Sequence, residues 1–349
     1  MNKKNKGNAT IRDVAARAGV STATISRVFN RKEYIQEDTI KKVISAAQEL
    51  HYRSDELDSL LNAPRSQQPR PLGTSELIIF SVPSFDNPFY SGLFKGASAS
   101  AQSHNFDILL SQGVITDSNV EQYISMYRRV NAKGIISTNI LSAPVLSALN
   151  SAVPVVQCGE FIAESNVSAV SIDDYAAARQ AIEYILSIGR KKIALLNGPL
   201  EYKYAKERSR GFTSTLEENG VHVNQDWILP LNDINADMAF SATIKLFSNH
   251  EQPDAIFAVS DVLATGAIRA VNYVGKNVPK DVVVVGFDNI ALSTMMIPSI
   301  TTVNQPSFQM GYLANEFLFE KLQNPLTETK RMLLDTELII RESSMVNNI

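Results

Sequence analysis

The sequence contains little cysteine, little histidine and no long hydrophobic run. Cys158 is its only cysteine, which excludes a disulfide framework and a multi-thiolate metal site. No apolar run approaches the roughly 18–20 residues that span a bilayer, and the polar, lysine-rich residues 1–10 contain no apolar region typical of a signal peptide. We therefore expect a cytoplasmic protein. The histidines show no metal-ligand spacing, so we expect no metal and no cofactor; they are His51, His104, His222 and His250.

Motifs of several enzyme classes are also absent. The sequence has no G-x-G-x-x-G, no Walker loop and no G-x-S-x-G, so no motif indicates dinucleotide binding, a P-loop or a serine nucleophile. An enzyme that modifies sugars or nucleosides would need a general base or nucleophile, and the sequence pattern offers none. We therefore predict a protein that is not an enzyme.

Charge is distributed unevenly along the 349 residues. Residues 1–53 carry eleven Lys or Arg and five Asp or Glu, a charge of +6, whereas the whole chain carries −3. The remaining residues therefore carry −9. A small basic head on an acidic body is the distribution expected when only the head contacts a polyanion.

The basic head reads as three short helices. Thr10 and Asp13 have the spacing of a capping box, and Gly19 is suited to end the helix that they begin. Ser21 can cap a second short helix, and a third runs over about residues 37–50. Two helices joined by such a tight turn have the dimensions of a helix-turn-helix.

In a helix-turn-helix, the first residues of the second helix reach base edges in the major groove. Here these residues are small, polar or cationic, and Arg27 has the geometry to pair bidentately with guanine. A small helical cap with a solvated basic face is the alternative, but the charge of +6 and the two spaced caps favour DNA binding. The predicted DNA contacts in the head are Thr10, Ser21, Thr22, Ala23, Ser26, Arg27 and Asn30.

The chain divides into a head (residues 1–60), a hinge and linker rich in Pro, Gln and Ser (61–75) and a body (76–349). In the body, short apolar runs alternate with amphipathic stretches, which predicts two doubly wound units with parallel sheets. The expected strands are Leu77–Val82, Asp107–Ser111, Gly134–Ser137, Val153–Gln157, Ala169–Ile172, Lys192–Leu196, Ala255–Val259, Val282–Phe287 and Thr301–Val303. The expected helices include Phe89–Ser103, Asp174–Ser187, Ala205–Asn219, Asp237–Phe247, Val262–Val274 and Phe308–Leu322.

Residues 9–30 closely resemble the N-terminal signature of the LacI/GalR family of bacterial transcription regulators; they read ATIRDVAARAGVSTATISRVFN. The resemblance extends over nearly the whole chain. Further family-like segments are NPFY (87–90), IGRKKIA (188–194), NGP (197–199), RSRGF (208–212), SDVLATGA (260–267), VGFDN (285–289) and TTVNQP (301–306). Within the family, EF (160–161) and LDTELIIR (334–341) look most like the cytidine-regulator branch.

The resemblance implies an α/β fold: a helix-turn-helix head and a periplasmic-binding-protein-like body. This body has two lobes with parallel Rossmann-like sheets, is crossed three times by the chain, and holds a small effector in its cleft. Parallel sheets place ligands beyond the carboxyl ends of their strands, and several candidate residues follow such ends. The predicted effector contacts are Phe89, Tyr90, Glu160, Tyr204, Arg208, Asp261 and Asp288. Asp233 stands where many relatives have an aromatic residue, so ring stacking from that side is not expected.

The hinge departs from the family pattern. Relatives usually have a proline-asparagine pair after the Tyr52 position and a small-residue hinge helix, whose leucine enters the minor groove. Leu61 falls on the leucine position, but Ser54 stands at the proline position. The small hinge residues are replaced by three acidic ones, Asp55, Glu56 and Asp58. Because DNA phosphates repel these carboxylates, we expect the hinge to insert only weakly into the minor groove.

These observations predict a DNA-binding transcription regulator, a repressor, controlled by a sugar or nucleoside effector. Its partners are operator DNA, the effector and a second copy of the chain, with no membrane. Some relatives form tetramers through a C-terminal heptad helix. A homodimer is expected here instead, because the nine residues after Ile340 are too few for such a helix. A solute-binding protein for sugars is the alternative, but such a protein needs a secretion signal.

Overall fold

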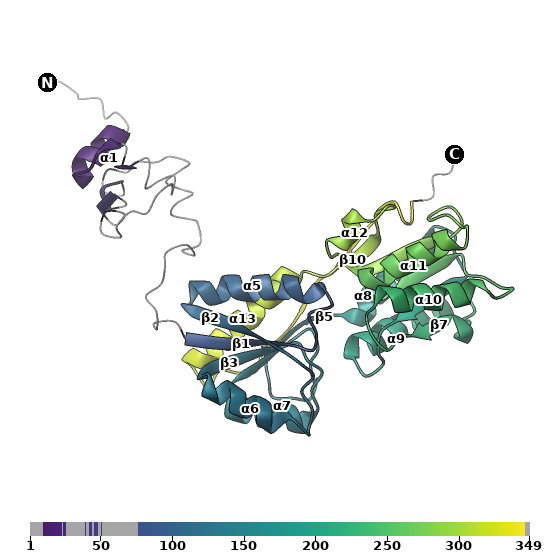
Figure 1. The fold of residues 1–349 in the computed structure, drawn as a ribbon, viewed down its shortest axis with the longest axis horizontal. Helices are drawn as coiled ribbons and strands as arrows, with labels where there is room; N and C mark the ends of the chain where they lie inside the picture. Colours follow the sequence, from purple (N-terminus) through teal and green to yellow (C-terminus); the bar gives the residue numbers. More distant parts are fainter. Residues whose placement is uncertain are drawn as a thin grey trace. The chain divides into compact units, whose positions relative to one another are not determined.

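The computed structural model describes residues 10–22, 24–25, 39, 42–43, 45–47, 50 and 76–345 (Figure 1). The chain forms two compact units, residues 1–69 and 70–349, and this division falls within the predicted linker. Among the described residues, no helix combines the length and the apolar composition that crossing a membrane requires.

The first unit begins with the predicted capping box. In α1 (Ile11–Ala18), the Thr10 side chain accepts a hydrogen bond from the Asp13 N–H, and Asp13 Oδ2 accepts one from the Thr10 N–H at 2.8 Å. Gly19 ends the helix at φ 69°, a left-handed conformation that favours glycine. Ser21 Oγ then accepts from the Thr24 N–H at 3.1 Å. The two predicted caps are therefore confirmed.

Apolar side chains from all three predicted helices of the head share one small core. Its buried members are Val14, Ala15, Ile25, Val43, Ala46 and Ala47. Their spacing puts one face of each helix inward, as the sequence pattern predicts.

The second unit contains two six-stranded sheets. The N-terminal lobe has the strand order β11-β5-β4-β3-β1-β2, and all its pairings are parallel. Helices α5 and α13 cover one face of this sheet and α6 and α7 the other (Figure 1). The bounds are β1 (Glu76–Val82), α5 (Phe89–Ser103), β2 (Phe106–Gln112), α6 (Val120–Arg129), β3 (Ala132–Ser137), α7 (Ala143–Ala152), β4 (Val155–Cys158), β5 (Ala169–Ile172), α13 (Ser307–Gln323) and β11 (Arg331–Leu334).

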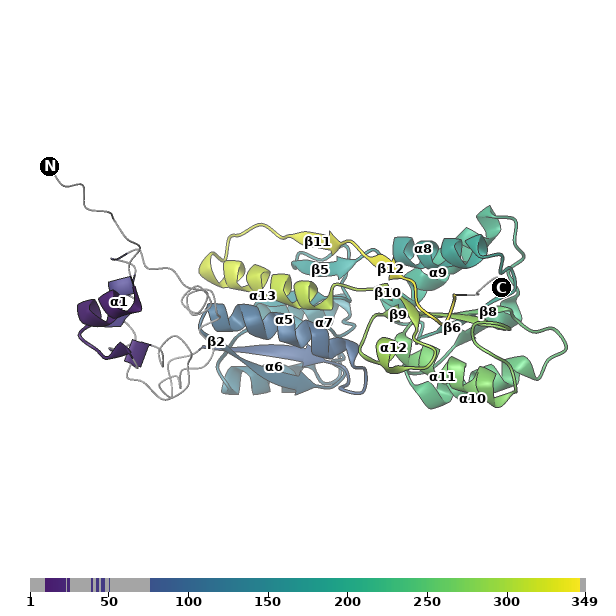
Figure 2. The same cartoon turned by 90° about the horizontal axis from the view of Figure 1, so that it is seen from above.

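The C-terminal lobe has the strand order β12-β10-β9-β8-β6-β7, parallel except for the β10–β12 pair. Helices α8 and α9 cover one face and α10 and α11 the other (Figure 2). The bounds are α8 (Asp174–Ser187), β6 (Ile193–Asn197), α9 (Lys203–Glu218), η1 (Gln225–Trp227), β7 (Ile228–Pro230), α10 (Ala236–Phe247), β8 (Ala255–Ala258), α11 (Asp261–Tyr273), β9 (Val283–Asp288), α12 (Leu292–Met295), β10 (Thr301–Asn304) and β12 (Glu337–Ile339).

The chain passes between the lobes three times, from β5 to α8, from β10 to α13 and from β11 to β12. These crossings, together with the parallel sheets, confirm the predicted α/β fold class. The predicted strands and helices of the body are all present. Strands β7, β11 and β12 are absent from the prediction. Each is a short edge strand whose side chains are half-buried or exposed, so burial does not impose on it the apolar run that marks the predicted strands.

Candidate functional site

A cavity of about 310 Å³ lies where the carboxyl ends of the two sheets meet. Residues that follow β1, β3 and β4 line it from the N-terminal lobe, and residues at the ends of β6, β8 and β9 line it from the C-terminal lobe. Six of the seven predicted effector contacts belong to this lining: Phe89, Tyr90, Glu160, Tyr204, Arg208 and Asp288. The structure thus brings together side chains that lie up to 199 positions apart in the sequence.

Aromatic rings enter the cavity from both lobes. Phe89 and Tyr90, at the start of α5, have ring centroids 5.9 Å apart, and Tyr202 and Tyr204, at the start of α9, have centroids 5.5 Å apart. Burial raises the pKa of the Tyr90 hydroxyl well above its ordinary value, so this group stays neutral. Such rings offer flat apolar faces and hydroxyl groups to a polar ring.

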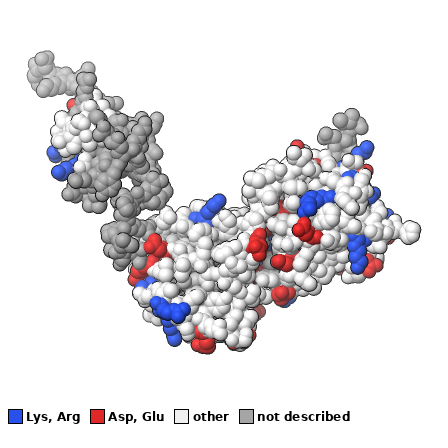
Figure 3. Space-filling model, in the orientation of Figure 1, with Lys and Arg blue, Asp and Glu red and all other residues white. Residues whose placement is uncertain are grey.

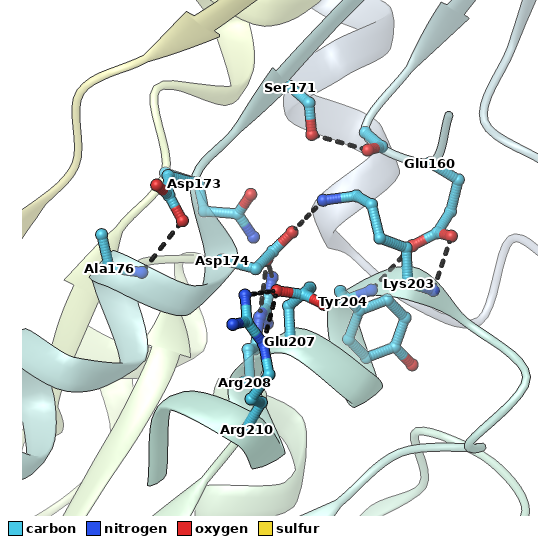
Figure 4. Close-up of polar contacts among 12 residues, drawn as sticks. Glu160, Ser171, Asp173, Asp174, Ala176, Lys203, Tyr204, Glu207, Arg208 and Arg210 are labelled. Atoms are coloured by element: carbon cyan, nitrogen blue, oxygen red, sulfur yellow. Dashed lines mark hydrogen bonds and ion pairs between the residues drawn. The ribbon is translucent and has the colours of Figure 1, made fainter. Parts of the chain in front are cut away.

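Arg208 is buried and held from several sides (Figure 4). Its Nε donates to Asp174 Oδ1 at 2.9 Å, and its Nη1 donates to the Val259 carbonyl at 2.6 Å. Nη1 also lies 3.7 Å from Asp288 Oδ1, and the guanidinium lies 3.5 Å from the centroid of the Phe287 ring. These contacts fix the orientation of the guanidinium. A charged group that is already oriented can bind a ligand with little reorganisation.

Asp174 is a site residue that the sequence analysis missed. It is the first residue of α8, directly after the first chain crossing, and its carboxylate pairs with both Arg208 and Lys203. Asp174 lines the cavity and is buried. Its position at the end of β5 was a usable signal, since this is where parallel strands place ligand-binding groups.

Asp288 is buried at the end of β9 in an unusual backbone conformation. Its φ is 106°, in a region that non-glycine residues rarely adopt. The carboxylate accepts a hydrogen bond from Gln305 Nε2 at 2.7 Å. Burial, opposed by the nearby Arg208, raises the pKa of Asp288 to about 6. At neutral pH the group is therefore an anionic acceptor beside a fixed cation.

Glu160 lines the cavity and also contacts the protein backbone. Its Oε2 accepts from the Lys203 N–H at 2.8 Å and its Oε1 from the Tyr204 N–H at 3.1 Å (Figure 4). Burial raises the pKa of Glu160, although both backbone hydrogen bonds act to lower it. Both carboxylate oxygens are thus engaged at the start of α9.

Asp261, the seventh predicted effector contact, is not among the residues that line the cavity, so its contact with an effector stays a prediction. It is fully buried as the first residue of α11, and its Oδ2 accepts from the Ile290 N–H at 2.9 Å. Its Oδ1 packs against Gly286 and has no hydrogen-bond partner. Burial and the nearby Asp288 raise the pKa of Asp261 to about 8. The side chain supports the loop after β9 from within the protein.

Asp261→Asn should reduce the dependence of stability on pH. Because the pKa of Asp261 is higher in the folded chain than in the unfolded chain, the folded state binds an extra proton between about pH 4 and pH 8. Stability conferred by this protonated form is lost as the pH rises through that window. The gain in unfolding temperature of Asp261→Asn over the wild type should therefore grow from pH 5 to pH 8. The exposed Asp226→Asn is the control, and an equal gain at every pH would contradict the assignment.

The charge of the cavity lining is mostly negative. Of the described residues that line it, one is an arginine and six are acidic: Asp86, Glu160, Asp174, Glu201, Asp233 and Asp288. Figure 3 shows acidic side chains on the face where the two lobes meet. Asp233, the departure noted in the sequence, is one of these lining residues, and its Oδ1 accepts from the Ile234 N–H at 2.7 Å.

Three of the predicted DNA contacts lie in the part of the head that the structure describes. Thr10, Ser21 and Thr22 are exposed, and the first two cap helices. The others lie outside the described residues: Ala23, Ser26, Arg27, Asn30 and the hinge residue Leu61. Their roles stay predictions.

Each of the two units contains a segment that matches the model of a known protein family. Residues 10–55 match the model for bacterial regulatory proteins of the lacI family, and residues 182–344 match that for a periplasmic binding protein-like domain. The ribose operon repressor of Halalkalibacterium halodurans is 33% identical over 339 residues, which are 96% of this chain and 97% of that protein. The repressor CytR of Escherichia coli is 28% identical over 344 residues, 98% of each chain.

Solved structures of transcriptional regulators are also similar to nearly the whole chain. The transcriptional regulator CelR in complex with cellobiose is 28% identical, with a TM-score of 0.71 over 96% of this chain and 100% of that one. The lac repressor dimer bound to operator and the anti-inducer ONPF is 25% identical, with a TM-score of 0.69 over 97% and 100%. This chain is 33% identical to a known repressor over nearly the entire length of both, and it therefore belongs to the LacI family of bacterial regulatory proteins.

Proposed function

We propose that this chain is a transcriptional repressor whose affinity for operator DNA is controlled by a small, uncharged polar effector in the 310 Å³ cavity. The observation that carries the proposal is the buried Arg208–Asp288 pair at the meeting of two parallel sheets, in a chain whose N-terminal helices have capped helix-turn-helix spacing. The known repressors to which the chain is similar over almost its whole length support this function.

The cavity favours a sugar or a nucleoside over an anionic ligand. A carboxylate acceptor next to a guanidinium donor suits vicinal hydroxyl groups, and aromatic rings suit the face of a sugar or a base. The acidic lining would repel a phosphate or carboxylate group. Cellobiose, an uncharged sugar, is bound in the structurally similar regulator CelR.

The solute-binding alternative is weaker. A protein that only delivers a sugar has no use for a helix-turn-helix, and residues 10–55 match the lacI family of regulatory proteins. A gel shift with operator fragments, with and without a panel of sugars and nucleosides, tests the proposal. Operator binding that no member of the panel changes would contradict effector control.

On the DNA side, Arg27→Ala should weaken specific binding by roughly 1–3 kcal/mol if Arg27 reads a base. The measurement is the affinity for operator and for random DNA at one salt concentration, because both depend strongly on salt. An equal loss on both DNAs would make Arg27 a phosphate contact. Unchanged binding on both would contradict the assignment of the recognition helix.

We also propose a homodimer formed through the body. Strand β2 is an edge strand, and its Leu109 and Leu110 are 42% and 41% exposed. Exposed apolar edge strands are usually covered, because they otherwise promote aggregation. Leu110→Asp should convert the sedimenting species from dimer to monomer and lower operator affinity, since two heads on a palindrome are needed for tight binding. The charge control is Gln112→Asp, at another exposed position of β2. A Leu110→Asp variant that still sediments as a dimer would exclude this edge.

A further inference from the structure

Glu160 joins the two lobes at the edge of the cavity. It follows β4 in the N-terminal lobe, and its carboxylate accepts from the N–H groups of Lys203 and Tyr204, the first two residues of α9 in the C-terminal lobe (Figure 4). We call these two hydrogen bonds the inter-lobe contact. They connect residues 43 and 44 positions apart.

The start of α9 has no cap of its own. The first N–H groups of a helix lack partners within the helix, and Tyr202 at the N-cap position makes no side-chain cap. A carboxylate at this end is also favoured by the helix dipole. Glu160 therefore supplies from the other lobe what a local Ser, Asp or Asn supplies at α7, α8 and α10.

We propose that Glu160 is a positioning residue, which holds the start of α9 against the N-terminal lobe and so sets Tyr204 and Arg208 for effector binding. This inference rests on the proposed effector function of the cavity. Both side chains belong to α9, and Arg208 is one turn beyond Tyr204. A change in the lobe arrangement that separates Glu160 from α9 would therefore move both of them relative to Phe89 and Tyr90.

The surroundings of Glu160 support a specific role. Gly159, directly before Glu160, turns the chain with a φ of 85°. Two hydrogen bonds hold this turn: the Gly159 N–H donates to the Val170 carbonyl at 2.9 Å, and Ser171 Oγ donates to the Gly159 carbonyl at 2.6 Å. The Lys203 ammonium pairs with Asp174 instead of Glu160. The contact thus depends on the backbone of α9 and not on a lysine side chain.

A second cavity, of about 250 Å³, lies on another side of the inter-lobe contact. Glu160 and Glu201 line both cavities, whereas Asn139, Phe161 and Lys206 line only the second. With open space on two sides, little packing is available to replace the two hydrogen bonds when Glu160 is truncated.

Amide hydrogen exchange tests the inter-lobe contact without any ligand. In the wild type, the amides of Lys203 and Tyr204 should be protected although they open a helix. Glu160→Ala should raise their exchange rates at least tenfold, and Glu160→Gln, which keeps one acceptor oxygen, should raise them less. The matched control is Asn235→Ala: the Asn235 side chain accepts from the Asp237 and Met238 N–H groups at the start of α10, within one lobe.

The control should accelerate exchange at α10 and leave α9 unchanged. If Glu160→Ala and Glu160→Gln leave the Lys203 and Tyr204 amides as protected as in the wild type, the inter-lobe contact does not hold α9 and the proposal is overturned. Faster exchange over the whole C-terminal lobe in both variants would likewise overturn it, because it would show a general loss of stability.

A pair of substitutions at Lys203 tests the consequence for binding. Lys203→Ala removes the ammonium, whereas Lys203→Pro also removes the N–H that Glu160 accepts. Proline is well tolerated at the first helical position, and Tyr202, at φ −74° and ψ 141°, has a conformation that suits the residue before a proline. Calorimetry with ribose, cellobiose and cytidine gives the affinities.

For a compound that binds the wild type, Lys203→Pro should bind it about tenfold more weakly than Lys203→Ala, equivalent to ~1.4 kcal/mol. In a Glu160→Ala background this difference should disappear. Equal affinities of the two variants in the wild-type background would overturn the positioning role. If the wild type binds none of the three compounds or other sugars and nucleosides, the proposed effector function fails, and amide exchange alone decides whether Glu160 holds α9.

Discussion

Asp288→Asn is expected to lower the affinity for the effector at least a hundredfold, equivalent to about 2.8 kcal/mol, while operator binding stays at the wild-type level. The buried carboxylate lies 3.7 Å from the Arg208 guanidinium and faces the cavity. An amide of the same shape keeps the packing, but it loses the charge that makes hydrogen bonds from ligand hydroxyls strong. Titration calorimetry and a gel shift on the same preparation measure both quantities.

The pH dependence gives this prediction a second readout. Since the pKa of Asp288 is raised to about 6, the wild type loses the anionic acceptor as the pH falls below 6. Its effector affinity should fall between pH 7.5 and pH 5, whereas that of Asp288→Asn should change little. Asp226→Asn removes the same charge from the exposed surface of the C-terminal lobe and is the control. An Asp288→Asn variant that responds to wild-type effector concentrations would exclude Asp288 from the site.

Gly311→Val is expected to lower the free energy of unfolding of the body by more than about 3 kcal/mol, because α5 and α13 are in close backbone contact. A Cβ at Gly311 would lie 1.9 Å from the Leu93 carbonyl oxygen, and one at Gly96 would lie 1.8 Å from the Phe308 carbonyl oxygen. Both obstacles are backbone atoms, so relief requires one helix to move. Intrinsic helix propensity alone would favour replacing glycine, so the loss is attributable to the clash.

Urea unfolding of Gly311→Val and of Gln309→Val separates these effects. Gln309 is exposed on the same helix and receives the same β-branched side chain, so Gln309→Val should cost only a few tenths of a kcal/mol. A Gly311→Val variant as stable as Gln309→Val would show that the two helices can separate at little cost.

The sequence determined the head and the general plan of the body, because the signals for both are local. Thr10 and Asp13 lie three residues apart, and Gly19 and Ser21 lie two residues apart directly after the helix, so caps and turns could be predicted without knowledge of the tertiary structure. The alternation of apolar runs and amphipathic stretches likewise predicted the parallel sheets. Arg208 and Asp288 were identified as candidates since they follow strands or match family motifs.

Only the tertiary structure decided which charges meet. Arg208 pairs with Asp174, 34 positions earlier, and Glu160 reaches the backbone of α9 across the lobes. Asp261 has the same kind of position at a strand end as Asp288, yet it is buried away from the cavity. Local patterns give the element on which a side chain lies, whereas its partners depend on the three chain crossings and the packing of the two lobes. Those depend on contacts between distant segments, which no local pattern records.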